Sequence, residues 1–577
     1  LAVRAPRLGH VLVDLGEIRE RATVDVDEPV DVAALPWPEP ADWVARIGAS
    51  PLVGEGRPLR LEGSALYLDR YWREEQQVAA DLAGLAEPGE VDTGVLAAGI
   101  GRLFSGEDAD DDQKVAAATA VLRRLAVVAG GPGTGKTTTV ARIVALLEEQ
   151  AAARGAAPPL VALAAPTGKA AARLQEAVHE EAARLDISES VRARLLALEA
   201  STLHRLLGWK PGSHSRFRHD RGNRLPYDVV IVDETSMVSL SLMARLVEAV
   251  RPEARLVLVG DPGQLTSIEA GAVLGDIVGS AAGAPRMSAS ARAAVAEASG
   301  VSVDADGGSH AAGGSAIGDG IVVLRRIHRF GGGIQRLAEA IRTGDADRAI
   351  DVLSSGSDDI LWIPVDPGEP NALDQLKPVR DGAVAAGRAV IEAARAGDAI
   401  AALEHLGSFR VLCAHRRGPY GVATWMPRIE SWLAAEIPGF ASEGPWYVGR
   451  PLLVTENDHA IRLYNGDTGV VVTSPNTGRP AAGFERRGEV VTFSPTRLAA
   501  VETVYAMTVH KSQGSQFGTA AVVLPDPASP ILTRELLYTA VTRAETRLIL
   551  AAADESIRSA VSQPIARASG LRERLSQ

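Results

Sequence analysis

The stretch that decides the fold lies in the first third of the chain, where residues 125–144 read LAVVAGGPGTGKTTTVARIV. It begins with an apolar run, passes through a glycine-rich turn and ends in a helical pattern. The turn matches GxxxxGK(S/T), the signature of phosphate-binding loops, whose backbone N–H groups surround phosphates. A chance glycine-rich turn is the alternative, and the flanking strand and helix disfavour it. The stretch predicts a nucleotide site in an α/β fold with a parallel sheet.

The residue types in this loop predict how ATP and Mg²⁺ would be held. The Lys136 ammonium would reach the β- and γ-phosphate oxygens, and the Thr137 hydroxyl would ligate Mg²⁺. The glycines would let the backbone approach the phosphates closely. The predicted nucleotide-binding residues of the loop are Gly131, Pro132, Gly133, Thr134, Gly135, Lys136, Thr137 and Thr138.

Two later strand ends carry the polar residues that ATP hydrolysis needs. The apolar run 229–232 is followed by Asp233, which would anchor Mg²⁺, and by Glu234, which would activate water as a general base. An exposed acidic pair that caps a strand is the alternative interpretation. The run 256–259 leads to Gln264, which would sense the γ-phosphate. A sensor on an adjacent strand favours a motor over a simple kinase.

Apolar β-branched runs, each followed by a polar or glycine-rich turn, recur along the chain. Runs at 125–128, 160–165, 229–232 and 256–259 predict one parallel sheet, and runs at 409–414, 521–524 and 548–550 predict a second. We therefore expect two α/β domains. The predicted division is an accessory domain over 1–105, a first α/β domain over 106–345 with a flexible insertion at about 275–320, and a second over 346–577 with a small β-barrel inserted at about 446–495.

Composition limits the classes of protein that remain. The net charge of −12 argues against a general basic surface that coats nucleic acid, so any grip on DNA must be local. Only six of the 60 basic residues are lysines, and three of these fall inside motifs. The single cysteine, Cys413, excludes a disulfide framework and favours a reducing, cytoplasmic compartment. The sequence contains no membrane-length apolar run and no signal pattern.

Eight pieces of the chain, in order, resemble the motifs of superfamily one DNA helicases, and more narrowly those of the RecD subunits of the exodeoxyribonuclease V (RecBCD) helicase–nuclease. The resemblance covers most of the chain from Gln113 to about Leu550. It implies two RecA-like P-loop NTPase motor domains, a small N-terminal accessory domain and an inserted SH3-like β-barrel. Besides the P-loop, the pieces are Gln113, 165–171 (APTGKAA), 201–208 (STLHRLLG), 233–237 (DETSM), 260–265 (GDPGQL), 328–330 (HRF), 508–515 (TVHKSQGS) and 537–544 (LYTAVTRA).

The resemblance assigns further roles around the nucleotide. It implies that Gln113 reads the adenine edge and that Arg329 and Arg543 act as arginine fingers, which are worth about 10³ to 10⁵ in rate in related NTPases. An ordinary solvated arginine is the alternative for either one. The family usually has glutamate where this chain has Gln516. An amide still hydrogen-bonds a ribose hydroxyl, but it carries no charge.

The same resemblance implies a set of residues that face DNA. Hydroxyls, backbone N–H groups and a few cations contact phosphates without reading bases, as a motor that tracks any sequence requires. Two histidines in the set have satisfied core histidines as the alternative interpretation. The set is Pro166, Thr167, Lys169, Thr202, His204, Thr508, His510 and Lys511.

These expectations combine into an ATP-dependent translocase. The resemblance implies 5′ to 3′ movement on single-stranded DNA, action at double-stranded DNA ends in recombinational repair, and two partners, a RecB-like helicase–nuclease and a RecC-like scaffold. No nuclease-type carboxylate cluster stands out in the sequence, so we expect DNA cutting to come from a partner. The rival interpretations are a free-standing RecD-like helicase, which would carry a longer N-terminal extension, and an ATP-gated structural module that binds DNA without moving.

Overall fold

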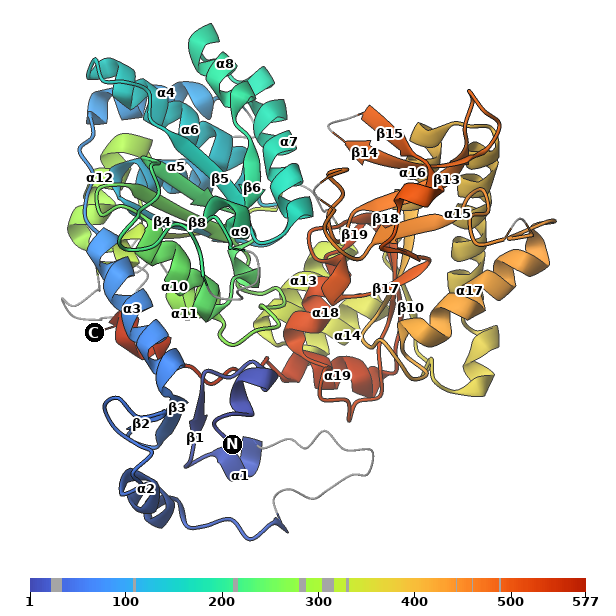
Figure 1. The fold of residues 1–577 in the computed structure, drawn as a ribbon, viewed down its shortest axis with the longest axis horizontal. Helices are drawn as coiled ribbons and strands as arrows, with labels where there is room; N and C mark the ends of the chain where they lie inside the picture. The colour runs from blue at the N-terminus through green and yellow to red at the C-terminus, as the bar shows by residue number, and fades with distance from the viewer. Residues whose placement is uncertain are drawn as a thin grey trace.

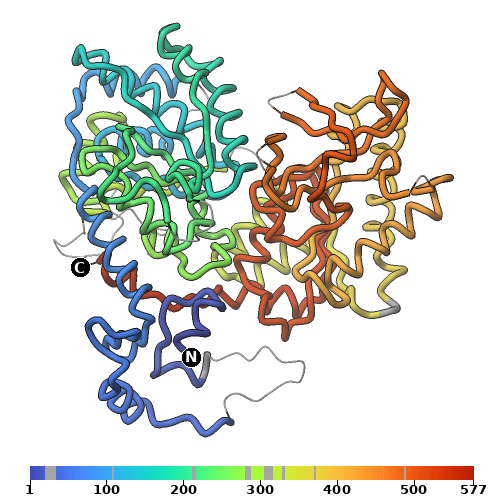
Figure 2. Tube along the Cα trace, in the orientation of Figure 1, coloured from blue at the N-terminus to red at the C-terminus, as the bar shows by residue number. Residues whose placement is uncertain are grey.

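The structure is a computed structural model that describes residues 1–21, 34–106, 110–210, 216–279, 287–303, 316–327, 332–442, 444–458, 460–486 and 489–576. Two parallel sheets form the centres of two halves that lie side by side, the first blue to green and the second yellow to red (Figure 1). The tube in Figure 2 shows the last residues returning from the second half to the first. The two predicted α/β units are therefore present.

The first half is built on a parallel sheet in the order β6-β5-β7-β8-β4-β9. Leu125 and Val127 of β4 pack on one face of this sheet, whereas Ala126 and Val128 pack on the other, because successive strand side chains alternate. The strands are β4 (Leu125–Gly130), β5 (Val161–Ala165), β6 (Ala200–Thr202), β7 (Val229–Val232), β8 (Arg255–Gly260) and β9 (Ile321–Leu324).

Helices cover both faces of the first sheet. One face carries α4 (Thr93–Leu103), α5 (Asp111–Leu122), α6 (Lys136–Ala153), α7 (Gly168–Arg184), α8 (Glu189–Ala197) and α12 (Ala289–Ser299). The other face carries α3 (Asp69–Leu85), α9 (Leu203–Leu206), α10 (Leu240–Ala249), α11 (Val273–Val278) and α20 (Leu571–Ser576).

The prediction of a flexible insertion at 275–320 is wrong for residues 287–303. Helix α12 begins after Ser288, whose hydroxyl accepts a hydrogen bond from the Ala291 amide, and it buries Val295 and Ala298 against the core shared with α4 and α5. Alanine-rich sequence resembles a low-complexity loop, but small side chains also let helices approach closely. Residues 280–286 and 304–315 lie outside the described ranges.

The second half is built on a parallel sheet in the order β10-β19-β18-β11-β17. Its strands are β10 (Ile360–Ile363), β11 (Phe409–Cys413), β17 (Ala506–Thr508), β18 (Phe517–Val523) and β19 (Ala544–Ala551). Its helices are α13 (Gly333–Thr343), α14 (Ala346–Ser354), α18 (Arg534–Val541) and α19 (Asp554–Ser562) on one face, and α15 (Lys377–Arg395) and α17 (Val422–Glu436) on the other. Because α13 is part of this core, the second half begins before the predicted residue 346.

An antiparallel sheet is inserted into the second half, as the strand-rich stretch 446–495 predicted. Its order is β15-β14-β13-β12-β16, and Leu452, Val471 and Phe484 fill its core. Helix α16 (Ala399–Ser408) packs against its β13. The strands are β12 (Pro451–Val454), β13 (Thr468–Thr473), β14 (Pro480–Arg486), β15 (Glu489–Phe493) and β16 (Val501–Thr503), so the sheet extends past residue 495.

A small N-terminal sheet precedes the first half. It has the order β1-β3-β2, with β1 (Leu12–Asp14), β2 (Leu59–Glu62) and β3 (Ala65–Leu68), and is accompanied by α1 (Ile18–Arg21) and α2 (Pro40–Gly48). Helix α3 follows β3 directly, but it buries Val78 and Leu82 in the core of the first half. The predicted accessory domain 1–105 thus contains two helices, α3 and α4, that pack on the first half.

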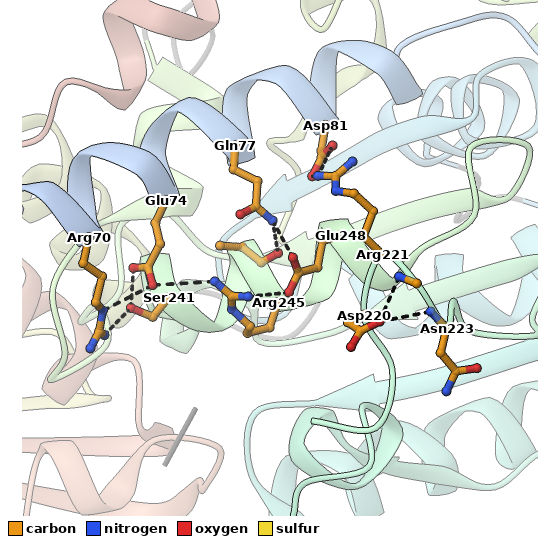
Figure 3. A network of polar contacts seen from close by, with 12 residues as sticks. Arg70, Glu74, Gln77, Asp81, Asp220, Arg221, Asn223, Ser241, Arg245 and Glu248 are labelled. Carbon is orange, nitrogen blue, oxygen red and sulfur yellow. Dashed lines mark hydrogen bonds and ion pairs between the residues drawn. The ribbon is translucent and has the colours of Figure 1, made fainter. Parts of the chain in front are cut away.

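Polar contacts join α3 to α10 along the same interface (Figure 3). The Ser241 hydroxyl donates to Glu74 at 2.6 Å, and Gln77 donates to Glu248 at 3.1 Å. Closer to the end of α3, Arg221 pairs with Asp81 at 2.7 Å. These contacts fix α3 on the first half as well as on the N-terminal sheet.

The chain ends in a segment that we call the C-terminal strap, residues 563–576. It leaves α19 of the second half and passes the N-terminal sheet, where the Ala568 carbonyl accepts hydrogen bonds from the Val11 and Leu12 amides at 2.8 and 3.3 Å. It ends as α20, whose Leu571 and Leu575 are buried in the core of the first half. The strap therefore lies outside the second half, although the predicted second domain ran to residue 577.

Candidate functional site

The phosphate-binding loop connects β4 to α6, as predicted. Gly133 and Gly135 adopt φ of 78° and 77°, a left-handed conformation that glycine alone adopts without strain. The Lys136 ammonium donates to the Gly130 and Gly131 carbonyls at 2.7 and 2.8 Å. Thr137 and Thr138 lie partly exposed in the first turn of α6, where free N–H groups favour anions. The loop has the shape and the donors that a triphosphate requires.

Gln113 lies against this loop from α5. Its side-chain amide is buried and donates to the Thr134 carbonyl at 3.1 Å, and Thr134 in turn donates to the Gly131 carbonyl at 2.9 Å. The structure therefore brings Gln113 to the nucleotide loop from a different helix.

Asp233 and Glu234 follow β7 and lie near Lys136. Asp233 is buried, and burial together with the neighbouring Glu234 raises the pKa of its carboxyl, while the Lys136 charge opposes that rise. Glu234 has φ of 51°, a conformation that costs a residue with a side chain of the order of 1–3 kcal/mol and that clusters at functional sites. The Asp233 carboxylate and the Thr137 hydroxyl are hard oxygen donors, which suit Mg²⁺.

Gln264 lies beside this pair, on the turn after β8. Its side-chain amide is buried and donates to the Asp261 carboxylate at 3.0 Å, and the Gly263 amide donates to the same carboxylate at 2.9 Å. Burial raises the pKa of Asp261, and the Lys136 charge lowers it. The sequence analysis gave Asp261, in the motif 260–265, no role. In the structure its carboxylate holds the Gln264 side chain in place.

The second half contributes Arg543 to the same region. The Arg543 guanidinium is buried and donates to the Thr539 and Ser515 carbonyls at 3.1 and 3.0 Å. Burial lowers the pKa of Arg543, whereas the charge of Glu234, from the first half, raises it. Arg543 thus lies within electrostatic reach of the predicted base. The other predicted finger, Arg329, lies outside the described residues.

Gln516 lies at the edge of this region. It is half-buried between Ser515, whose carbonyl accepts from Arg543, and Phe517, the first residue of β18. Its predicted ribose contact remains a prediction.

The three threonines of the predicted DNA set have local partners for their hydroxyls. Each hydroxyl accepts a hydrogen bond at 3.2 Å from the backbone amide three residues later: Thr167 from Ala170, Thr202 from Arg205 and Thr508 from Lys511. Each hydroxyl therefore caps the first turn that follows it. Pro166 is half-buried next to Thr167. The caps hold the turns whose N–H groups would face a phosphate backbone.

The cations of that set occupy different environments. Lys169 is half-buried and donates to the Ser515 hydroxyl of the second half at 2.7 Å, and burial lowers its pKa to about 7. Lys511 is exposed and lies 3.6 Å from Glu502. His204 is exposed next to Phe217. His510 is half-buried; burial lowers its pKa most, and the charges of Arg567 and Arg416 lower it further. Neither histidine is a fully buried core residue.

A cavity of about 410 Å³ lies between α7 and the inserted sheet. Its walls include Thr202 from the predicted DNA set and side chains that the sequence analysis did not single out. A Cβ on Gly168, the residue before Lys169, would lie 2.8 Å from the Tyr464 side chain. The connection between β12 and β13 of the inserted sheet therefore touches the first half there. The lining includes Gln175, Thr202, Arg205, Asn457, Arg462 and Tyr464.

Sequence reasoning missed the residues that bridge the two halves beside the nucleotide. The Thr539 hydroxyl accepts from the Leu265 amide at 2.9 Å, and the Gln513 amide donates to the Leu265 carbonyl at 2.8 Å. Thr539 lies in the motif 537–544 and Gln513 in the motif 508–515, so the sequence did offer a polar side chain within each motif as a sign of function. Which partner each would find depends on how the halves meet, which the sequence does not reveal.

Comparison with known families gives three matched regions. Residues 1–67 match the N-terminal domain of the RecBCD enzyme subunit RecD, residues 113–270 match an AAA domain, and residues 503–551 match a UvrD-like helicase C-terminal domain. The Pif1 helicase from Candida albicans aligns with a TM-score of 0.39 at 15% identity, over 77% of this chain and 95% of that chain. No helix in the described ranges has the length and hydropathy needed to cross a membrane.

Relatives match over much longer stretches. The RecBCD enzyme subunit RecD of Mycolicibacterium smegmatis is 49% identical over all of this chain and 92% of its own length. The Haemophilus influenzae RecD subunit is 34% identical over 71% of this chain and 64% of its own length. The ATP-dependent RecD2 DNA helicase of Deinococcus radiodurans is 31% identical over 72% of this chain but only 46% of its own length. The chain therefore belongs to the RecD family of RecBCD enzyme subunits.

Proposed function

We propose that this chain is the ATP-dependent DNA helicase subunit of a RecBCD-type helicase–nuclease, moving 5′ to 3′ on single-stranded DNA. One observation carries the proposal. Lys136, Asp233 and Glu234 of the first half gather at the edge where the Glu234 charge reaches the buried Arg543 guanidinium of the second half. A site divided between two halves can couple hydrolysis to their relative movement, as a translocase requires and a simple ATP-gated module does not.

In this mechanism Lys136 would hold the β- and γ-phosphates, and Thr137 and Asp233 would hold Mg²⁺, which neutralises the charge that develops on the phosphates. Glu234 would take a proton from the attacking water. Gln264 would sense the γ-phosphate, and Arg543 with Arg329 would stabilise the transferring phosphoryl group when the cleft closes. Gln113 and Gln516 would contact the adenine and the ribose.

The tracked strand would contact the cap turns of Thr167, Thr202 and Thr508, with Pro166, Lys169, His204, His510 and Lys511 beside them. The cavity between α7 and the inserted sheet adjoins this path, since Thr202 and Gly168, the residue before Lys169, line it. Its walls carry three arginines and four carboxylates: Arg205, Arg462, Arg486, Glu176, Glu199, Asp467 and Glu485. The inserted sheet would form an SH3-like barrel that contacts the tracked DNA strand. A RecB-like helicase–nuclease and a RecC-like scaffold would be the partners, at double-stranded DNA ends in recombinational repair, and the N-terminal sheet would dock to them.

Strand unwinding by the chain, alone and with coexpressed partners, tests the proposal. DNA with a 5′ or a 3′ single-stranded tail is the substrate, Lys136→Gln is the inactive control, and Lys377→Gln, on the exposed surface of α15, is the matched neutral change. We expect the unchanged chain and Lys377→Gln to unwind DNA from the 5′ tail, and Lys136→Gln to have lost this activity. ATP hydrolysis without unwinding from either tail, in every mixture, would overturn the translocase and favour the gated module.

A further inference from the structure

Tyr538 of the second half lies against two glycines of the first. It stands on α18 and is 4% exposed. A Cβ on Gly131, in the phosphate-binding loop, would lie 2.8 Å from the Tyr538 hydroxyl oxygen, and a Cβ on Gly263 would lie 3.4 Å from its ring. The backbone of Gly131 is not left-handed, so its conformation does not explain why glycine stands at this position. The tyrosine from the opposite half supplies a reason, because a side chain at position 131 would occupy its place.

The Tyr538 hydroxyl has a defined partner at this contact. It lies beside the buried Asp261 carboxylate: a Cβ on Gly263 would lie 3.3 Å from Asp261 Oδ1 and 3.4 Å from the Tyr538 ring, and burial together with the Asp261 charge raises the pKa of Tyr538. The same carboxylate accepts from the Gly263 amide and from Gln264. A buried carboxylate needs such donors, because its desolvation is costly. Asp261 thus joins Tyr538 of one half to Gln264 of the other.

Two neighbours extend the same attachment along the turn. Thr539, next to Tyr538, and Gln513 bind the two backbone polar groups of Leu265, the residue after Gln264. Leu265 itself is buried in the core of the second half. Gln264 is therefore held on both sides by groups that the second half provides or orients.

We propose that Tyr538 is a positioning residue for ATP hydrolysis, because its hydroxyl fixes Asp261, and Asp261 in turn aims the Gln264 side chain at the γ-phosphate only while the second half is docked. The inference rests on the proposed function. It assigns Tyr538 a role separate from that of the arginine fingers, since the hydroxyl acts through Asp261 and carries no charge to the phosphates.

Tyr538→Phe removes the hydroxyl and keeps the ring on Gly263. DNA-stimulated hydrolysis by the full chain should show kcat about tenfold lower with KM for ATP within about twofold, because a hydrogen bond used at the transition state is lost. Tyr447→Phe is the matched control, since its buried hydroxyl bonds Tyr505 at 2.9 Å in the same half, and it should leave kcat unchanged. An unchanged kcat in Tyr538→Phe would overturn the inference.

A double-mutant cycle tests whether the hydroxyl acts through Asp261. Asp261→Asn combined with Tyr538→Phe should be no slower than Asp261→Asn alone, whereas multiplied effects would contradict the inference. If Tyr538→Phe does not fold, Asp261→Asn alone provides the second test: it keeps the size of the side chain but weakens the acceptor, so kcat should fall, and an unchanged kcat would overturn the inference. A wild-type chain without DNA-stimulated hydrolysis would instead refute the proposed function, and this inference with it.

Discussion

Two of the interfaces that join the two halves differ in character. At the cleft interface, the turn 260–265 and Gly131 meet Tyr538, Thr539 and Gln513 through hydrogen bonds and close contact over glycine, and a single aliphatic side chain, Leu265, is buried in the second half. At the strap interface, the C-terminal strap inserts Leu571 and Leu575 into the core of the first half. One hydrogen bond contributes about 1 kcal/mol, whereas one buried aliphatic side chain contributes about 1.5–3 kcal/mol.

The strap interface also contains a fully buried carboxylate with three donors. Glu75 on α3 is fully buried and accepts from the Ser569 hydroxyl at 2.8 Å, the Gly570 amide at 2.9 Å and the Arg574 guanidinium at 3.3 Å. A contact that breaks and reforms in each cycle is best built from few, individually weak bonds. We therefore expect the cleft interface to open during the cycle and the strap interface to persist and keep the halves together.

The largest expected effect separates chemistry from stability at the cleft. Glu234→Gln keeps the size and the left-handed backbone of the residue but removes the base, so kcat for ATP hydrolysis should fall about 10³-fold. The thermal midpoint should not change, because the side chain is partly exposed. Steady-state hydrolysis and a melting curve measure both quantities. Glu253→Gln, exposed in the same half, is the control, and near-normal hydrolysis by Glu234→Gln would remove Glu234 as the base.

At the strap the expected pattern is the reverse. Glu75→Ala leaves Arg574 without its buried partner, so the free energy of unfolding should fall by about 3 kcal/mol. The kcat of the folded chain should stay near wild type, since Glu75 is part of the strap interface and not of the cleft. Chemical denaturation and hydrolysis under native conditions test this, with exposed Glu55→Ala as the control. A stable variant that has lost hydrolysis would contradict the division between the interfaces.

The local parts of the fold were predictable from sequence. Seven strands of the two parallel sheets and the β4–α6 turn follow from apolar runs and a fixed motif, which are properties of short stretches. The sequence analysis did not predict the other four strands, β6, β9, β10 and β17. Helix α12 and the C-terminal strap were missed, because their stability comes from packing against residues far along the chain. Leu571 of α20 lies in the same core as Leu82 of α3, for example, and no pattern within either stretch indicates that shared core.

The candidate site divides in the same way. Lys136, Asp233 and Gln264 lie together as the motifs predicted, because each follows a strand of one parallel sheet. The bridging roles of Tyr538, Thr539 and Asp261 depend on the docking of two halves. Lys169 was predicted as a DNA contact from family position, but its pairing with Ser515 in the other half emerges only in three dimensions.

Lys169 gives a smaller effect that extends the comparison to DNA. Its pKa of about 7 means that the ammonium is charged below that pH and increasingly neutral above it. Lys169→Met should therefore weaken single-stranded DNA binding about tenfold at pH 6, and clearly less at pH 8.5, since one charged hydrogen bond is worth about 1.5–3 kcal/mol. Fluorescence anisotropy at both pH values measures this. Exposed Lys210→Met is the control, and an equal loss at both pH values would refute the titration.

Arg221 gives the smallest expected effect and shows which contacts hold α3 in place. Its pair with Asp81 at 2.7 Å has a half-exposed guanidinium, so Arg221→Ala should lower the free energy of unfolding by about 1 kcal/mol or less. Asp81→Ala should do the same, and the double variant should lose no more than either. A loss above about 2 kcal/mol in denaturant titrations would mean that the surface pairs, rather than the buried aliphatic contacts of Val78 and Leu82, hold α3. The contrast between a persistent packed interface and a reversible polar one would then lose its physical basis.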